Sequence, residues 1–389
     1  MVKLKTDILV IGAGLAGIRA ALAAKEADPD AHVVLASFSA EPHGSSFSNV
    51  HNRLGIQVCQ DDDEKKMFTR EAISIAPPGE INPNLVKILA DESCEAFQDL
   101  RQWGAKIKRD SSGLPVRVRG CFSPVQARAN ILMDMDHFFY KLKKRLEDQG
   151  VDFMPGWQAE DVLTEGEPGR SRALGAVLKK VGSIKKKVWV YSKAVILASG
   201  GSAAAYRMNL SGAGKASLIL HDWCDRHGLE YVNKAYTQFV WCKADDFGDW
   251  SILNLSGKEA CFRDSTGKIR AVPEHFGPLF ETRKTHAPMA YGFKDRAIDQ
   301  LLVDNLDAKG RIEVFHPDTG WMRVVLAAQV SNGGIRVDQN GRTRLSGLFA
   351  CGECAGGMHG ANRLGGAMVL AGQVFGKRAG ISAAMEIGR

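Results

Sequence analysis

Short apolar runs that end in glycine are the clearest pattern along the chain. Residues 7–11 (DILVI) form a β-branched run of the kind that suits a buried parallel strand, and residues 18–27 (IRAALAAKEA) favour a helix. A second apolar run covers residues 32–37 (HVVLAS), and a third ends in a glycine pair at 194–201 (AVILASGG). Strands that alternate with helices in this way predict an α/β fold.

The glycine spacing between the first strand and the first helix indicates a dinucleotide site. Residues 12–17 read GAGLAG, in which Gly12 permits a tight turn and Gly14 lets the backbone approach a pyrophosphate. Gly17 lets the helix pack closely on the strand. The free N–H groups at the helix N-terminus then attract phosphate. We therefore predict a Rossmann-type nucleotide-binding domain at the start of the chain.

The end of the second predicted strand lacks the usual acidic residue that holds ribose hydroxyls. Ala36 and Ser37 stand in that place. Either a hydroxyl group, from Ser37 or Ser39, or the backbone must take the ribose contact. This departure argues against a standard NAD site.

Composition narrows the class of protein further. The chain has 389 residues, 51 basic and 44 acidic, and a net charge of +7. No long basic block or aromatic ladder accompanies this excess of basic residues. We therefore interpret these residues as part of a solvated surface and expect no nucleic-acid partner. The eight cysteines are scattered, and no apolar run is long enough to span a membrane. We expect no metal site and a cytoplasmic protein, or a peripheral member of a membrane-associated complex.

Motifs far along the chain indicate a family. Residues 347–366 read GLFACGECAGGMHGANRLGG, and residues 43–46 (HGSS) and 198–201 (ASGG) precede them in the expected order. With the N-terminal GAGLAG, these motifs make the chain resemble the succinate dehydrogenase, fumarate reductase and L-aspartate oxidase flavoprotein family over nearly its whole length. We also predict that residues 334–338 (GIRVD) and 347–353 (GLFACGE) pair as strands that close the nucleotide domain.

The resemblance implies FAD and a Rossmann-type FAD-binding domain interrupted by a smaller α+β capping domain. The expected bounds are 1–238 and 326–389 for the FAD-binding domain and 239–325 for the capping domain. The helical C-terminal domain of larger members has no expected counterpart. We expect non-covalent FAD, because Ser45 or Ser46 aligns where a linking histidine would stand. The expected FAD-binding residues are Gly12, Gly14, Ala16, Gly17, Ser37, Ser45, Ser46, Ala198, Gly200, Gly201, Glu353, Gly366, Ala367 and Val369.

Two arginines are the catalytic candidates that the resemblance implies. Arg363, in HGANR, would hold a substrate carboxylate with its guanidinium fork, although a structural salt bridge is the alternative. Arg296 would move a proton with help from a partner such as Asp295, although a solvated helix start is the alternative. The two histidines that hold a dicarboxylate in the family are replaced by Val240 and Gln329. We therefore expect a substrate other than a C4 dicarboxylate.

These features predict an FAD-dependent oxidoreductase that transfers hydride between the flavin and a carboxylate-bearing substrate. One alternative is an amine or amino-acid oxidase. Another is an electron-transfer subunit with an iron–sulfur or other redox protein as partner, which the missing histidines, the missing C-terminal domain and the short cap favour. The sequence has neither a second GxGxxG unit nor a ferredoxin-type cysteine cluster, so electrons must come from a substrate, a partner or oxygen. Cys351 and Cys354 could form a flavin-coupled disulfide, although packing is the simpler interpretation.

Overall fold

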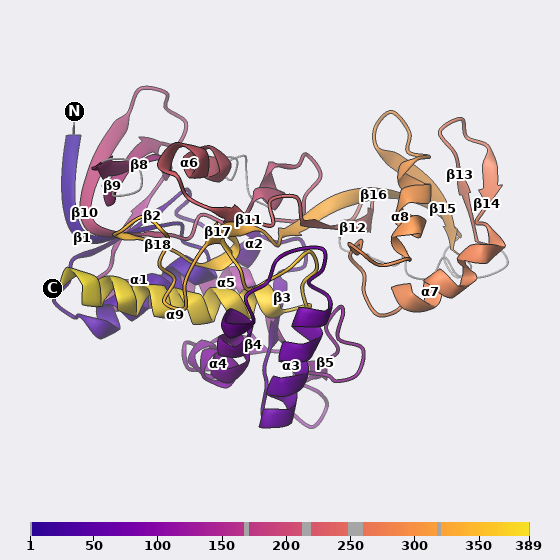
Figure 1. The fold of residues 1–389 in the computed structure, drawn as a ribbon, viewed down its shortest axis with the longest axis horizontal. Helices are drawn as coiled ribbons and strands as arrows, with labels where there is room; N and C mark the ends of the chain where they lie inside the picture. Colours follow the sequence, from indigo (N-terminus) through magenta and orange to yellow (C-terminus); the bar gives the residue numbers. More distant parts are fainter. Residues whose placement is uncertain (1, 167–170, 212–218, 248–259, 317–319, 389) are drawn as a thin grey trace.

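The computed structural model describes residues 2–166, 171–211, 219–247, 260–316 and 320–388. Figure 1 shows a larger body that contains both chain ends and a smaller body at the far end of two long strands. The larger body is built on a mixed sheet with helices packed against it, which confirms the predicted α/β fold with a Rossmann-type domain.

The main sheet forms where the sequence predicts buried strands. The strand predicted at 7–11 begins earlier, at Val2, because its first residues pair with a long partner strand. Ile8, Leu9 and Val10 are fully buried, as expected for a central parallel strand. The strands of this sheet are β7 (Asp152–Pro155), β2 (Val33–Ser37), β1 (Val2–Ile11), β10 (Lys187–Leu197), β9 (Arg172–Lys180) and β8 (Trp157–Glu165), in that order, with β18 (Leu348–Ala350) beside β10.

Two helices pack against each other and against this sheet. Helix α1 (Leu15–Ala27) follows the glycine turn, and the C-terminal helix α9 (Ala367–Ile387) lies along it (Figure 1). The other helices of the larger body are α2 (Gly44–Phe47), α3 (Asp62–Ser74), α4 (Pro83–Gln102), α5 (Met135–Asp148) and α6 (Ile219–His227). Capping fixes where several of them begin; for example, the Asp61 carboxylate accepts a hydrogen bond from the Glu64 amide at 2.8 Å at the start of α3.

Two small sheets complete the larger body, and they correct one prediction. The segments predicted to pair, 334–338 and 347–353, do not pair with each other. The first forms β17, in a three-stranded sheet, whereas the second forms β18, which joins the main sheet in parallel with β10. An apolar run can enter either kind of sheet, so sequence alone did not reveal its partner. The three-stranded sheet contains β11 (Tyr231–Val232), β17 (Gly334–Arg336) and β19 (Ala355–Gly356). The other small sheet contains β3 (Arg53–Gln57), β6 (Ala129–Met133), β4 (Lys106–Ile107) and β5 (Arg117–Val118).

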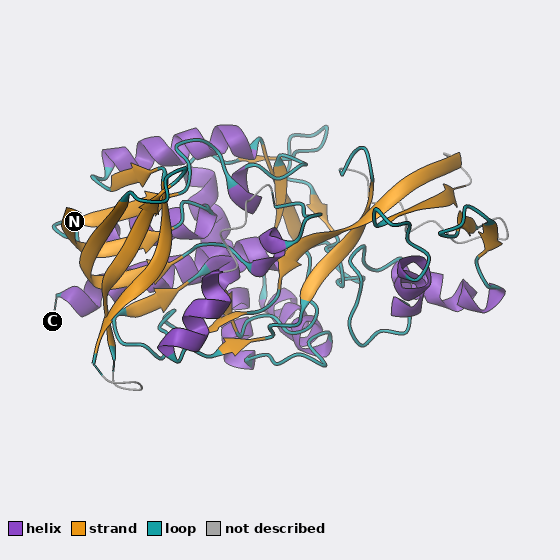
Figure 2. Cartoon of the chain, turned by 90° about the horizontal axis from the view of Figure 1, so that it is seen from above, coloured by secondary structure: helices purple, strands orange, loops and turns teal. Residues whose placement is uncertain are grey.

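The smaller body has a sheet and an apolar core of its own. Strands β12 (Thr237–Lys243) and β16 (Gly320–Ser331) extend into it from the larger body, as Figure 2 shows from above. The predicted domain bounds at 238/239 and 325/326 therefore fall inside these two strands. The remaining elements of the smaller body are β13 (Cys261–Arg263), β14 (Ile269–Ala271), β15 (Arg311–His316), α7 (Gly277–Arg283) and α8 (Arg296–Val303).

Candidate functional site

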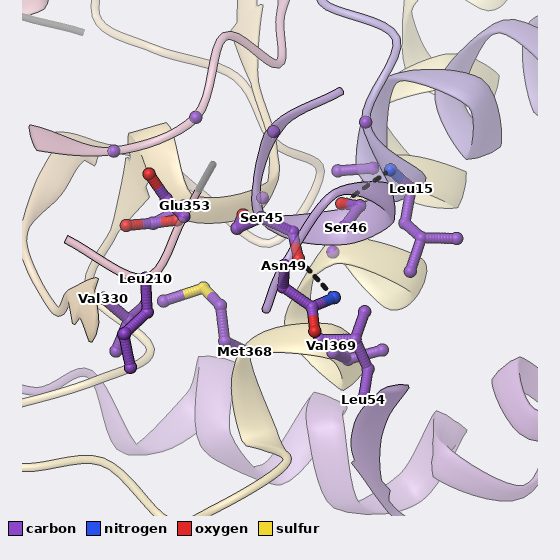
Figure 3. Close-up of a pocket in the computed structure, with 18 of the residues that line it drawn as sticks. Leu15, Ser45, Ser46, Asn49, Leu54, Leu210, Val330, Glu353, Met368 and Val369 are labelled. Atoms are coloured by element: carbon purple, nitrogen blue, oxygen red, sulfur yellow. Dashed lines mark hydrogen bonds between the residues drawn. The ribbon is translucent and has the colours of Figure 1, made fainter. Parts of the chain in front are cut away.

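A cavity of about 450 Å³ opens where the parallel strands of the main sheet end. Ligands of open α/β sheets bind at this edge, beyond the carboxyl ends of the strands. The ends of β1, β2 and β10, the first turn of α1, β16 and the start of α9 all contribute to its lining. Figure 3 shows side chains around it, with Glu353 and Val330 on one side and Ser46 and Leu15 on another.

The glycine turn shapes the part of the cavity that suits a pyrophosphate. Gly12 has φ +109°, and a Cβ there would lie 2.3 Å from the Ala198 carbonyl oxygen. A Cβ at Gly17 would lie 1.8 Å from the Gly12 carbonyl oxygen, so Gly17 serves the packing of α1 and does not line the cavity. Helix α1 has no acidic residue in its first turn, and the Leu15 amide donates to Ser46 Oγ at 3.1 Å (Figure 3). Ser46 thus engages one N–H group at the N-terminus of α1, and the remaining N–H groups and the helix dipole there suit a phosphate.

The region after β2 contains an acidic residue that sequence reasoning missed. Ser37 lines the cavity, but its hydroxyl donates to the Ser39 carbonyl oxygen at 2.8 Å. Glu41 also lines the cavity, and its carboxylate accepts a hydrogen bond from the Tyr140 hydroxyl at 2.5 Å. It stands four residues beyond the end of the strand, where the usual search for the ribose acid does not look.

Glu353 lies where a carboxylate can accept hydrogen bonds from a ligand in the cavity. Its Oε1 accepts from the Ser331 amide at 2.8 Å. A Cβ on Gly201 would come within 2.4 Å of the same carboxylate, so the glycine makes room for it. Burial raises the pKa of Glu353 to about 7, against the opposing effect of that amide.

Arg363 brings a guanidinium group to the wall of the same cavity. Its side chain is buried, and Nη1 donates to the Leu364 carbonyl oxygen at 2.8 Å. Within the described part of the chain, Nε has no hydrogen-bond partner and no carboxylate forms an ion pair with the guanidinium, so the alternative of a structural salt bridge has no support there. Burial lowers the pKa of Arg363 to about 10, while Cys121 and Glu353 oppose that change. The arginine remains a cation at neutral pH.

The two residues that replace the family histidines lie in different surroundings. Val240 is fully buried and packs with Leu210, Cys242 and Ala327, and it does not line the cavity. Gln329 does line the cavity, and its Oε1 is buried without a hydrogen-bond partner.

Arg296 is not brought to the cavity. It begins α8 in the smaller body, where its guanidinium lies 4.7 Å from the ring centroid of Tyr291. Asp295, its expected partner, instead accepts a hydrogen bond from Arg283 Nε at 2.7 Å and lies 3.0 Å from His286 Nε2. The proposed pairing of Arg296 with Asp295 is therefore absent from the structure, because the buried Arg283 competes for that carboxylate.

Cys351 and Cys354 are free thiols. Both are buried, and Cys354 Sγ lies 3.2 Å from the carbonyl oxygens of Leu197 and Cys351. Burial raises the pKa of Cys354 to about 11 and that of Cys351 well above its ordinary value. Neither thiol forms a reactive thiolate at neutral pH, which favours packing over redox chemistry.

Most of the sequence-predicted cofactor residues converge on the cavity. Gly17 and Ala367 pack behind it instead. Gly366 has φ +86°, close to the backbone of β3. The predicted residues that line the cavity are Gly12, Gly14, Ala16, Ser37, Ser45, Ser46, Ala198, Gly200, Gly201, Glu353, Gly366 and Val369. Sequence reasoning did not predict several further lining residues, including Asn49, Leu54, Leu210 and Met368 (Figure 3).

The donor set fits a dinucleotide with a flavin. A glycine turn and a helix N-terminus suit phosphates, two carboxylates suit hydroxyl groups, and the apolar Leu210, Val330 and Met368 suit a planar ring. Over residues 7–253 and 251–369, the sequence matches the family model described as FAD binding domain. The chain belongs to this family. The prediction that it binds FAD is confirmed.

Individual relatives agree with this family. The chain is 28% identical to a fumarate reductase (CoM/CoB) subunit of Methanothermobacter marburgensis, over 97% of this chain and 72% of that protein. It is 26% identical to an L-aspartate oxidase of Halobacterium salinarum, over 97% of this chain and 75% of that protein. Its fold matches the solved Mycobacterium smegmatis Sdh1 complex with a TM-score of 0.77, at 18% identity, over 100% of this chain and 69% of that one. The predicted FAD-dependent oxidoreductase of this flavoprotein family is confirmed.

Within the described ranges, no helix has both the length and the apolar character needed to cross a membrane.

Proposed function

We propose that this FAD-dependent oxidoreductase transfers hydride between its flavin and a carbon next to a substrate carboxylate. The observation that supports this most directly is Arg363, a buried cation whose side chain lines the cavity of the FAD motifs. Bound FAD supplies the two-electron chemistry. Arg363 binds and orients the carboxylate, because a guanidinium fork matches the two oxygens of that group.

The substrate is a carboxylic acid other than a C4 dicarboxylate. Fumarate carries two negative charges, and Arg363 is the one buried cation among the described residues that line the cavity. Val240 and Gln329 supply no charge where the family histidines would stand. A second carboxylate would therefore be buried without a cation, which is costly.

Arg296 is not placed to transfer a proton to a ligand in the cavity. Arg296 lies outside the cavity, and Asp295 is engaged by Arg283 and His286. A role for Arg296 requires the smaller body to close over the flavin.

A redox protein is the proposed electron partner. Two comparisons support it, since one structural neighbour is a complex and one relative is named as a reductase subunit. We propose an iron–sulfur or other electron-transfer protein in this role, at the surface of a peripheral or cytoplasmic assembly. The L-aspartate oxidase relatives support a second candidate function, oxidation of an amino acid with oxygen as acceptor.

The test is reoxidation of the flavin under anaerobic conditions. The purified protein is reduced and then mixed with a panel of α,β-unsaturated acids, fumarate among them, while the flavin spectrum is followed. A charge-assisted hydrogen bond contributes about 1.5–3 kcal/mol, so Arg363→Ala should slow the reaction with the preferred acid by about 10- to 100-fold. Arg119→Ala is the matched control, because Arg119 lines the same cavity from an exposed position and should change the rate little.

Each outcome points to one function. Reoxidation by an acid that depends on Arg363 supports the proposal. Reoxidation by oxygen with peroxide release, together with reduction of the flavin by an amino acid, replaces it with the oxidase. In a third outcome, no acid reoxidises the flavin and no amino acid reduces it, but the flavin exchanges electrons with a co-purified iron–sulfur protein. This outcome replaces the proposal with the electron-transfer subunit.

A further inference from the structure

Gln329 occupies a β-bulge at the wall of the cavity. Strands β12 and β16 pair Gln238 with Val330, and the next pair is Phe239 with Ala328. Gln329 is therefore the extra residue and has no opposite partner. In a regular strand, neighbouring side chains point to opposite faces, yet Gln329 and Val330 both line the cavity. A bulge re-aims a side chain in this way, and bulges are common beside active sites.

The side-chain amide of Gln329 has no hydrogen-bond partner among the described residues. Its Oε1 is buried and makes no hydrogen bond to any described residue. A buried acceptor left unsatisfied costs about 1–3 kcal/mol. Arg363 Nε, from a different part of the chain, is buried and unpaired in the same cavity. The cavity is thus lined by two polar side chains that each carry a buried, unsatisfied atom, one side chain charged and one neutral.

The buried charges that line the cavity can balance a single carboxylate. Glu353 lies close enough to Arg363 that each charge changes the other's pKa, so part of the arginine's positive potential is already compensated. Arg53 and Arg119 also line the cavity, but both are exposed to solvent. A carboxylate at Gln329 would have no buried cation beside it, whereas a carboxamide or hydroxyl group can both donate to and accept from an amide.

We propose that Gln329 is a specificity-determining residue. The substrate carries one carboxylate, which Arg363 binds, and one neutral hydrogen-bonding group such as a carboxamide or hydroxyl, which Gln329 binds. This inference rests on the proposed function, since it takes Arg363 as the carboxylate site.

The test compares two ligands of nearly equal shape. Succinate has two carboxylates, and succinamate has a carboxamide in place of one of them. Isothermal titration calorimetry on the oxidised FAD-loaded protein measures the dissociation constant of each, so turnover is not needed. We expect succinamate to bind at least about tenfold more tightly. Gln329→Leu should abolish this preference by weakening succinamate about tenfold, since it leaves the carboxamide without a partner.

Two further variants keep the test decisive. Gln329→Glu has nearly the same shape as the wild type and adds a negative charge, so it should weaken succinate more than succinamate. Arg119→Ala should leave the ratio of the two constants unchanged. An unaltered flavin spectrum and FAD content show that each variant is folded.

The outcomes separate this inference from the proposed function. One outcome is that the wild type binds both ligands equally, Arg363→Ala binds neither, and Gln329→Leu still binds both. In that case Gln329 does not determine specificity, while Arg363 remains the carboxylate site. If Arg119→Ala selectively weakens succinate, a second cation serves the cavity and the inference is wrong. If Arg363→Ala binds both ligands as the wild type does, then the proposed function fails and this inference fails with it.

Discussion

At Glu353, burial of a carboxyl group makes protein stability depend on pH. Burial raises its pKa from 4.5 to about 7. Between these values the folded protein retains a proton that the unfolded chain releases. The group therefore stabilises the fold fully below pH 4.5, and this contribution is lost as the pH rises through 7. We expect the unfolding temperature of the FAD-free protein to fall more steeply across this window than that of Glu353→Gln.

The comparison of the two proteins isolates this group from every other titration. The glutamine of the variant can still accept the hydrogen bond from the Ser331 amide, so the packing is retained. Thermal unfolding followed by circular dichroism at about pH 4.5, 6 and 8 would supply the two curves. Parallel curves would show that Glu353 has an ordinary pKa in the folded protein.

Single residues were predictable where a motif fixes their role, and not otherwise. Arg363 and Glu353 stand in a long specific motif, and both reach the cavity. Glu41 was missed because the Ser37–Ser39 hydrogen bond sets the course of the chain after β2, and that turn has no clear sequence signal. Gln329 was noticed only as a departure, because a β-bulge depends on the register of two strands that lie far apart in sequence.

At the scale of elements, close packing of α1 against α9 depends on glycines. Gly372, Gly376 and Gly380 are spaced by four residues on α9, so they share one face. A Cβ at Gly380 would lie 2.3 Å from the Ala20 carbonyl oxygen, whereas one at Gly372 would lie 3.4 Å from the Ala16 Cβ. The two helices thus approach most closely toward the C-terminal end of α9.

This difference predicts opposite effects for the same substitution. Gly380→Ala should destabilise the protein by about 1–3 kcal/mol, since the backbone of α1 must move. The added Cβ of Gly372→Ala meets the Ala16 Cβ at 3.4 Å and the Ala16 backbone at 3.9 Å, which are ordinary contact distances, so the gain in helix propensity, up to about 1 kcal/mol, should leave stability unchanged or higher. Urea unfolding of the two variants provides the measurement. Equal stability of the two variants would contradict the close contact at Gly380.

Element types were easier to predict than their partners. The strand–turn–helix unit at the N-terminus was predicted from local pattern, and α1 begins only three residues before the range predicted for it. The predicted pairing of residues 334–338 with residues 347–353 was wrong, because both are short apolar segments that fit more than one sheet. Pairing between distant strands depends on the whole fold and is not encoded in a local period.

At the scale of the whole molecule, Asn362 connects the two bodies beside Arg363, the proposed substrate-binding arginine. Its Nδ2 donates to the carbonyl oxygens of Ile75 at 2.9 Å and Tyr291 at 2.8 Å, and its Oδ1 accepts from the Tyr291 amide at 2.8 Å. Tyr291 belongs to the segment between α7 and α8, which returns from the smaller body. Because Arg363 is the next residue, the same short loop carries both the proposed carboxylate site and the contact to the smaller body.

Asn362→Ala should therefore loosen the segment 286–294 while the smaller body stays folded. The substitution leaves three backbone groups without partners, at about 1–3 kcal/mol for each buried group. Hydrogen exchange should accelerate by about tenfold or more in this segment, including the Met289 amide, which donates to the Phe239 carbonyl oxygen at 2.7 Å. The core of the smaller body around Trp241 should exchange as in the wild type, since it packs within that body.

Asn305→Ala is the matched control for this prediction. The Asn305 side chain donates to the Leu301 carbonyl oxygen at 2.8 Å, a contact that stays within the smaller body just after α8. Loss of that contact should not change exchange at 286–294. If Asn362→Ala and Asn305→Ala give the same exchange in this segment, the other contacts between the bodies, such as the stacking of Phe122 on His286, are sufficient to hold it. A selective effect of Asn362→Ala would instead mean that the position of the smaller body and the geometry at Arg363 are set by the same buried amide.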